Sequence, residues 1–193
     1  MSRFDKAIAL IDEAHALDPN KTTIDGKEVP YELHYAIQCT RFLSIRLPEA
    51  SEPLKLAIRA QHFRRWETPR SAYPMTRPGY FSWRTNAKKR QAELVERICL
   101  DVGYGEEESK RVGALIRKED LKVDVETQAL EDVACLVFLE DQFAEFAENH
   151  DEDKIVGVLR KTWKKMTEKG HEMALQIEMR GKEKSLVEKA LSG

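Results

Sequence analysis

The chain has 193 residues, of which 41% are hydrophobic and 34% charged, and its formal net charge at pH 7 is −2. This composition is typical of a single globular domain, here residues 1–193, and excludes collagen-like and low-complexity chains; no window holds the ~20 apolar residues that a membrane span needs. The cysteines are odd in number and lie far apart beside apolar residues, which favours reduced, packed thiols in a cytoplasmic protein; they are Cys39, Cys99 and Cys135.

Apolar residues recur at helical spacing along the chain and predict an all-α fold of about seven or eight helices. We expect helices over residues 2–17, 30–47, 51–66, 81–102, 106–117, 125–149 and 151–170, followed by a polar helical segment over 174–191. Turn residues at 18–20 and 25–26 separate the first two helices, and glycines at 103 and 105 end the fourth.

One long irregular segment, residues 68–79, interrupts this helical pattern. It holds three of the seven prolines together with Tyr73, and Tyr80 and Trp83 follow it closely. Proline restricts the backbone, and an ordered loop of this length within a compact domain is usually functional. We therefore expect an ordered loop that contributes to a site.

The low net charge conceals a basic segment between Arg59 and Arg90. Nine basic residues and one acidic residue give this segment a net charge of +8, whereas the rest of the chain carries −10. Arginine binds phosphate through parallel hydrogen bonds, and aromatic rings stack on bases. The expected binding residues are Arg64, Arg65, Arg70, Tyr73, Arg77, Tyr80, Trp83, Arg84, Lys88 and Gln91.

The partner that this segment predicts is a phosphorylated small molecule such as a nucleotide. An extended nucleic-acid surface is not expected, because the rest of the chain is acidic and carries no recognition motif. The alternative is a solvated basic face whose arginines pair with acidic residues elsewhere in the fold, and the sequence leaves both open.

Three residues are candidates for a metal site. His62 continues an apolar row at a spacing of four residues, so we expect it on the buried face of the third helix, and Asp132 lies on the apolar side of the sixth. His34 lies on or beside the apolar face of the second. Two imidazoles and one carboxylate suit a single divalent ion of Mn, Fe, Co, Zn or Mg, which would polarise a phosphate oxygen and activate water. In this hypothesis His62 and Asp132 are the catalytic residues; the alternative is a structural buried pair.

The order of His34, His62 and Asp132 along a helical chain resembles the layout of the HD-domain metal-dependent phosphohydrolases over about residues 30–146. In that superfamily, histidines and aspartates bind divalent metal and the enzymes hydrolyse phosphate esters, often of nucleotides. Here Phe63 follows His62 in place of the aspartate of the defining pair, and Gln91 stands where some members carry a further histidine. The resemblance implies an HD-like helical bundle that holds at most one metal ion, with residues 151–191 as a helical extension.

Four strings are similar to a family of small proteins of unknown function, some members of which carry a glutamyl-tRNA synthetase label. They are FDKAI at residues 4–8, AQHFRRWETPR at 60–70, GYFSWR at 79–84 and LEDVACLVFLE at 130–140. Aminoacylation is not expected, because the chain lacks a Gly-rich strand-to-helix turn and is too short for a nucleotide-binding α/β domain together with a tRNA domain.

The leading hypothesis is therefore an all-α protein that binds a phosphorylated small molecule, with hydrolysis by one divalent metal ion as its catalytic form. The alternative is a non-catalytic binding or interaction protein on the same fold, without metal. Substrate identity and oligomeric state, including a homo-oligomer, stay open.

Overall fold

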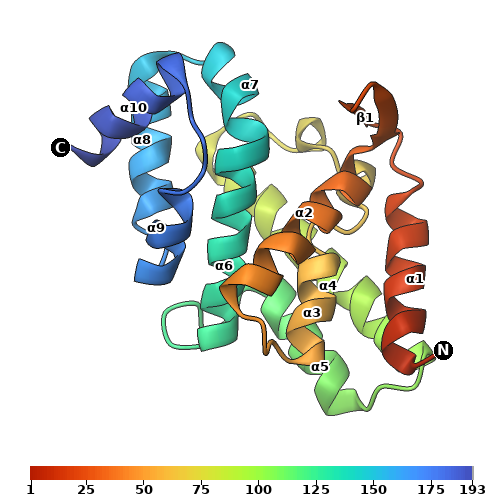
Figure 1. The fold of residues 1–193 in the computed structure, drawn as a ribbon. Coiled ribbons are helices and arrows are strands. Elements are labelled where there is room, and N and C mark those ends of the chain that lie inside the picture. Colours follow the sequence, from red (N-terminus) through yellow and green to blue (C-terminus); the bar gives the residue numbers. More distant parts are fainter. Residues whose placement is uncertain (193) are drawn as a thin grey trace.

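The computed structural model describes residues 1–192, and they contain ten α-helices and one short β-hairpin (Figure 1). The hairpin pairs β1 (Lys21–Ile24) with β2 (Lys27–Pro30). The helices are α1 (Arg3–His15), α2 (Tyr31–Arg46), α3 (Glu52–Arg59), α4 (Arg77–Asp101), α5 (Glu106–Arg117), α6 (Val125–Val137), α7 (Phe143–Glu148), α8 (Glu152–Trp163), α9 (Glu168–Ala174) and α10 (Gly181–Leu191). Two short 3-10 helices, η1 (Arg65–Glu67) and η2 (Arg70–Ala72), and one π-helical turn, η3 (Phe138–Gln142), lie between them. The mainly helical class is confirmed.

Side-chain caps begin six of these helices. In each, a Ser, Thr or Asp oxygen accepts a hydrogen bond from the backbone N–H three residues later, which satisfies a donor that the helix leaves without a partner. The capping residues are Ser2, Ser51, Thr76, Asp124, Asp151 and Thr167. Local sequence therefore sets where these helices begin.

The structure differs from the predicted elements at several places. The polar loop after α1 forms the hairpin, because Asp25 and Gly26 adopt the left-handed φ values of 49° and 76° that a two-residue turn requires. The third helix ends at Arg59, so His62 lies outside it and the predicted helical position of His62 is wrong. The π-helical turn divides the predicted helix over 125–149, and the one over 151–170 is divided into α8 and α9, which raises the number of helices above the expected seven or eight.

Helix α6 stands in the middle of the molecule. In Figure 1 it lies between the N-terminal helices and the group formed by α8, α9 and α10, and it packs against α2 and α9. Its Leu130, Val133 and Leu136 are wholly buried. They belong to one cluster of buried side chains that extends from Ala7 in α1 to Ala190 in α10. The C-terminal helices thus complete the same hydrophobic core as the N-terminal ones.

All three cysteines are free and buried, as the sequence predicts. Within residues 1–192, no helix combines the length and the apolar character that crossing a bilayer would require.

Candidate functional site

A pocket of about 340 Å³ opens between α4, α6 and the residues that follow α3, α5 and α8. Its volume falls within the range of small-molecule sites. Seven of the residues that the sequence singles out line it together. They are His62, Arg65, Tyr80, Trp83, Arg84, Lys88 and Gln91.

The pocket is strongly basic. Lys118 and Lys165 add two cations that the sequence did not single out, and Glu131 is the acidic residue among the lining side chains. Five cations therefore face one carboxylate. Such a concentration of one charge in a concave site attracts and orients anions.

Three of the five cations have no carboxylate partner among residues 1–192. Arg65 Nη1 donates to His62 Nε2 over 2.8 Å, and Arg84 Nη1 donates to the hydroxyl of Tyr80 over 3.1 Å. Lys88 Nζ donates to the carbonyl of Arg117 over 3.2 Å. Burial is the first cause that lowers the pKa of Arg65 and of Lys88, and the positive charge of Lys118 is the next for Lys88. A partly buried cation that lacks an anion costs free energy, which an incoming anion would recover.

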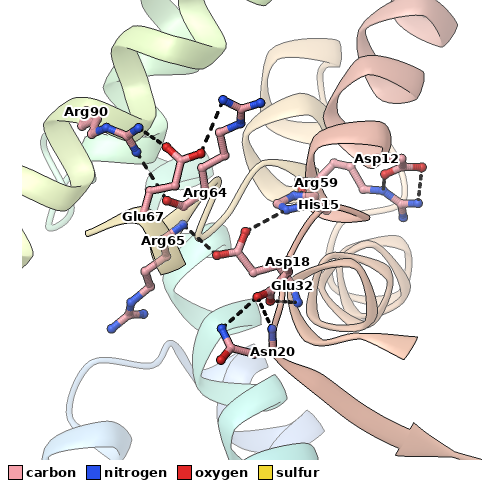
Figure 2. Close-up of polar contacts among 10 residues, drawn as sticks. All are labelled: Asp12, His15, Asp18, Asn20, Glu32, Arg59, Arg64, Arg65, Glu67 and Arg90. Atoms are coloured by element: carbon pink, nitrogen blue, oxygen red, sulfur yellow. Dashed lines mark hydrogen bonds and ion pairs between the residues drawn. The ribbon is translucent and has the colours of Figure 1, made fainter. Parts of the chain in front are cut away.

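Backbone strain positions the segment that carries Arg65. His62 and Arg64 both adopt left-handed φ, 64° and 50°, a conformation that few non-glycine residues adopt. Glu32 holds the segment, because its Oε1 accepts the Arg65 backbone N–H over 2.7 Å while its Oε2 lies 3.1 Å from His15 Nδ1. Figure 2 shows the Arg65 side chain extending away from Glu32 and from Glu67. The network fixes the backbone and leaves the guanidinium for the pocket.

His62 is neutral in this arrangement. A guanidinium only donates hydrogen bonds, so the contact with Arg65 makes His62 Nε2 an acceptor. The other side of the imidazole stacks on Tyr35 at 4.4 Å between ring centroids. Burial, followed by the charges of Arg65 and Lys118, holds the pKa of His62 well below its usual range. The imidazole accepts the hydrogen bond from Arg65 and adds no positive charge near pH 7.

Gln91 is the most informative polar residue of the pocket wall. The residue is only 5% exposed and lines the pocket, and its side-chain amide forms no hydrogen bond within residues 1–192. The amide therefore offers a donor and an acceptor to the contents of the pocket.

Asp132 is not in the pocket, and its predicted role as a metal ligand and catalytic residue is not supported. Its two oxygens accept from Arg46 Nε over 2.8 Å, from the Thr167 backbone N–H over 2.8 Å and from Thr167 Oγ1 over 2.5 Å. Gly170 permits this approach, because a Cβ there would stand 2.7 Å from Asp132 Oδ1. The carboxylate joins α2, α6 and the start of α9, and its acceptor capacity is used by the fold.

The other predicted metal ligands also have separate partners. His34 Nε2 lies 2.8 Å from Asp141 Oδ1, which joins α2 to the π-helical turn. His62 faces Arg65, a cation that disfavours a second positive charge beside it. No group of three or more His, Cys, Asp or Glu side chains in residues 1–192 is arranged to hold a metal ion. The residues present therefore do not fit the divalent ion that the sequence suggested.

Four of the predicted binding residues do not line the pocket. Arg70 donates to the carbonyls of Tyr73, Pro74 and Thr76 and so fastens the proline-rich loop to itself. The Tyr73 hydroxyl accepts from Asn86. Arg77 is exposed and lies over the Phe81 ring. Arg64 pairs with Glu67 at 3.5 Å.

Comparison with protein families identifies the family of this chain. The model of a family described as "Domain of unknown function (DUF4202)" matches residues 5–187, nearly the whole length. The chain belongs to this family. No curated protein and no solved structure matches it. The resemblance drawn from the four sequence strings is thereby confirmed as far as a family of unknown function.

Three charged residues that line the pocket were missed by the sequence analysis. Lys118 and Lys165 follow α5 and α8, outside the basic segment, and Glu131 lies on the buried side of α6. One local signal was available, because Glu131 is a charged residue within a run of apolar ones and had to find a partner. Its partners are Lys118 Nζ, which donates to it, and Lys165 Nζ at 3.4 Å.

Proposed function

We propose that the pocket binds a small phosphorylated molecule. The observation that carries the proposal is the set of three cations, Arg65, Arg84 and Lys88, that line the pocket without a carboxylate partner. Phosphate is the anion that suits them best, because it accepts several charge-assisted hydrogen bonds and matches the planar guanidinium.

The rest of the wall supports an organic phosphate over a bare ion. Trp83 and Tyr80 are aromatic residues of the lining, and the amide of Gln91 offers both a donor and an acceptor. A hydroxyl or an amide-like edge of the organic part would satisfy that amide. The ligand class is therefore a sugar phosphate or a nucleotide, for which a volume of about 340 Å³ is adequate.

Binding is favoured over metal-dependent hydrolysis by one observation. Of the two residues proposed as catalytic, only His62 reaches the pocket, while Asp132 is engaged by Arg46 and Thr167. The HD-like fold type stays part of this proposal, supported by the order of His34 on α2, His62 after α3 and Asp132 on α6. A cytoplasmic compartment is likewise proposed, from the free buried cysteines.

Two adjacent lysines test this proposal. Lys88 lines the pocket, whereas Lys89 is exposed and lies 3.9 Å from Glu93. We expect a panel of nucleotides and sugar phosphates, titrated by calorimetry beside their dephosphorylated counterparts, to contain a phosphate-dependent binder. Lys88→Met should weaken that binding at least about tenfold, the loss of about 1.4 kcal/mol, while Lys89→Met should change it less than about twofold.

Equal affinities for the two variants, or no phosphate-dependent binder and no binding of inorganic phosphate, would contradict the proposal. Phosphate release from the same panel, measured with and without added Mn²⁺ or Mg²⁺, separates the two forms of the hypothesis. We expect no release above the protein-free blank.

A further inference from the structure

Glu131, Lys118 and Lys165 form a second charged group that lines the pocket. Glu131 is 5% exposed on α6, Lys118 ends α5, and Lys165 follows α8. All three line the same pocket as Arg65 and Arg84. Lys118 adopts a left-handed φ of 60°, so the backbone there is held in a conformation that a lysine does not prefer.

Glu131 acts as an internal counter-anion that keeps the two lysines at the wall. Although burial opposes ionisation, the charges of Lys118 and Lys165 hold the pKa of Glu131 below its usual range. One carboxylate shared by two ammonium groups leaves each of them with unused donors, since an ammonium has three. This wall is therefore preset for anions and only half neutralised.

The charge of the whole pocket exceeds what one phosphate supplies. Five cations and one carboxylate, with His62 neutral, give a net charge of +4. A phosphate monoester carries about −1.5 to −2 near pH 7. One such group would leave roughly half of the positive charge without a counter-charge, whereas two such groups would match it.

The cations fall into two neighbouring groups along α4, on which Arg84 and Lys88 lie one turn apart, a rise of about 6 Å along the helix axis. Arg65 lies over the ring of Trp83, the residue that precedes Arg84. Lys88 Nζ donates to the carbonyl of Arg117, the residue that precedes Lys118. A ligand with two anionic groups meets such an arrangement better than a single compact ion does.

We infer that the ligand carries two phosphate groups, either joined as a diphosphate or separated as a bisphosphate. The first group binds Arg65 and Arg84, and the second binds Lys88, Lys118 and Lys165 beside Glu131. This inference rests on the proposed function, because it assigns a second phosphate position in the same pocket.

Simple phosphate compounds test the second position without knowledge of the organic part of the ligand. At fixed ionic strength, calorimetry compares inorganic phosphate with inorganic pyrophosphate and with fructose 1,6-bisphosphate. We expect at least one of the two doubly phosphorylated probes to bind wild-type protein at least about tenfold more tightly than phosphate, and which of them does so distinguishes the diphosphate from the bisphosphate form.

Lys165→Met is the decisive variant, with Lys164→Met as its control. Lys165 is about half exposed, so the substitution is compatible with folding, and the neighbouring Lys164 is exposed, outside the pocket and without an acidic partner among residues 1–192. Lys165→Met should weaken the doubly phosphorylated probe at least about fivefold and phosphate less than twofold. Lys164→Met should leave both unchanged.

Glu131→Gln tests the counter-anion from the other direction. Removing the carboxylate frees both lysines, so the affinity for the doubly phosphorylated probe should rise at least about threefold in protein that retains the wild-type circular dichroism spectrum. Equal binding of all three probes, or an equal effect of Lys165→Met on phosphate and on the doubly phosphorylated probe, would overturn the inference and leave the proposed function standing. Absence of binding by every probe would overturn both.

Discussion

Arg77 and Arg84 lie two turns apart on α4, yet they meet different surroundings. Arg77, at the first turn of the helix, is exposed and lies over the ring of Phe81. Arg84 is half-buried, lines the pocket and has no carboxylate partner in residues 1–192. In the preceding loop, Arg70 donates hydrogen bonds to three backbone carbonyls. Arg70 therefore stabilises the loop and Arg77 faces solvent, whereas Arg84 is available to a ligand in the pocket.

Ion pairing within the fold distinguishes the other arginines of the basic segment from those of the pocket. Arg59 forms two hydrogen bonds with Asp12, at 2.6 and 2.8 Å, and Arg64 and Arg90 share Glu67 (Figure 2). These arginines raise the basic count of the segment without offering a site. The sequence shows the same charge at all these positions, and only the folded chain shows which charges are already satisfied.

The largest expected effect concerns a carboxylate that the fold uses. Asp132→Asn removes the charge that Arg46 and Thr167 share inside the protein. Breaking a buried ion pair by removing one partner costs about 3–5 kcal/mol, so the free energy of unfolding in urea should fall by that amount. Asp153→Asn, at an exposed position on α8, should change it by less than about 0.5 kcal/mol.

A metal or catalytic role for Asp132 predicts the opposite pattern. In that case the substitution would leave stability nearly unchanged and would abolish ligand-dependent activity instead. Equal urea midpoints for wild type and Asp132→Asn would place this carboxylate on the functional side of the comparison.

A smaller effect is expected from His62 and pH. Its pKa in the folded protein is lowered by burial and by the neighbouring cations, so the unfolded state binds the proton more readily than the native state does. The stability that follows from this difference is present above the unfolded pKa of about 6.5 and is lost as the pH falls below it. Between pH 7 and pH 5.5 the loss should be about 1 kcal/mol.

His62→Asn isolates this contribution, because asparagine tolerates left-handed φ and does not titrate. The difference in unfolding free energy between pH 7 and pH 5.5 should shrink by about 1 kcal/mol in this variant. Arg84→Gln, which removes one of the cations that lower the pKa of His62, should shrink it by less, and Arg77→Gln should not change it. An unchanged pH dependence in His62→Asn would contradict the assignment of a low pKa to this residue.

Local sequence signals account for much of the fold. The caps Ser51, Asp124 and Asp151 mark where α3, α6 and α8 begin, close to the predicted starts, and the apolar row of α5 gives its predicted range. The helical row that leads to His62 continued in sequence beyond the real end of α3, since no glycine or proline marks that end. At the end of α3 the carbonyl oxygen of Arg59 lies 2.9 Å from His15 Nε2, a tertiary contact that the local sequence does not reveal.

The pocket residues of α4 were predictable because they lie on one face of this helix. Trp83, Arg84, Lys88 and Gln91 follow helical spacing, so their common direction is a local property. Lys118 and Lys165 lie after two other helices, and only the folded chain, in which α5 packs on α4, brings them into the same pocket as Lys88. The partners of two predicted metal ligands were hidden for a related reason, since Asp132 bonds to Thr167 at the start of α9 and His34 lies beside Asp141 in the π-helical turn.

The central claim is that the pocket cations, and not the basic segment as a whole, bind the phosphorylated ligand. Titration of inorganic pyrophosphate into Arg84→Gln and Arg77→Gln tests it most directly, because the two variants remove the same charge from the same helix. The account predicts at least about a tenfold loss of affinity for Arg84→Gln and less than about a twofold loss for Arg77→Gln. Equal losses would contradict it and would show a diffuse basic surface in place of a site.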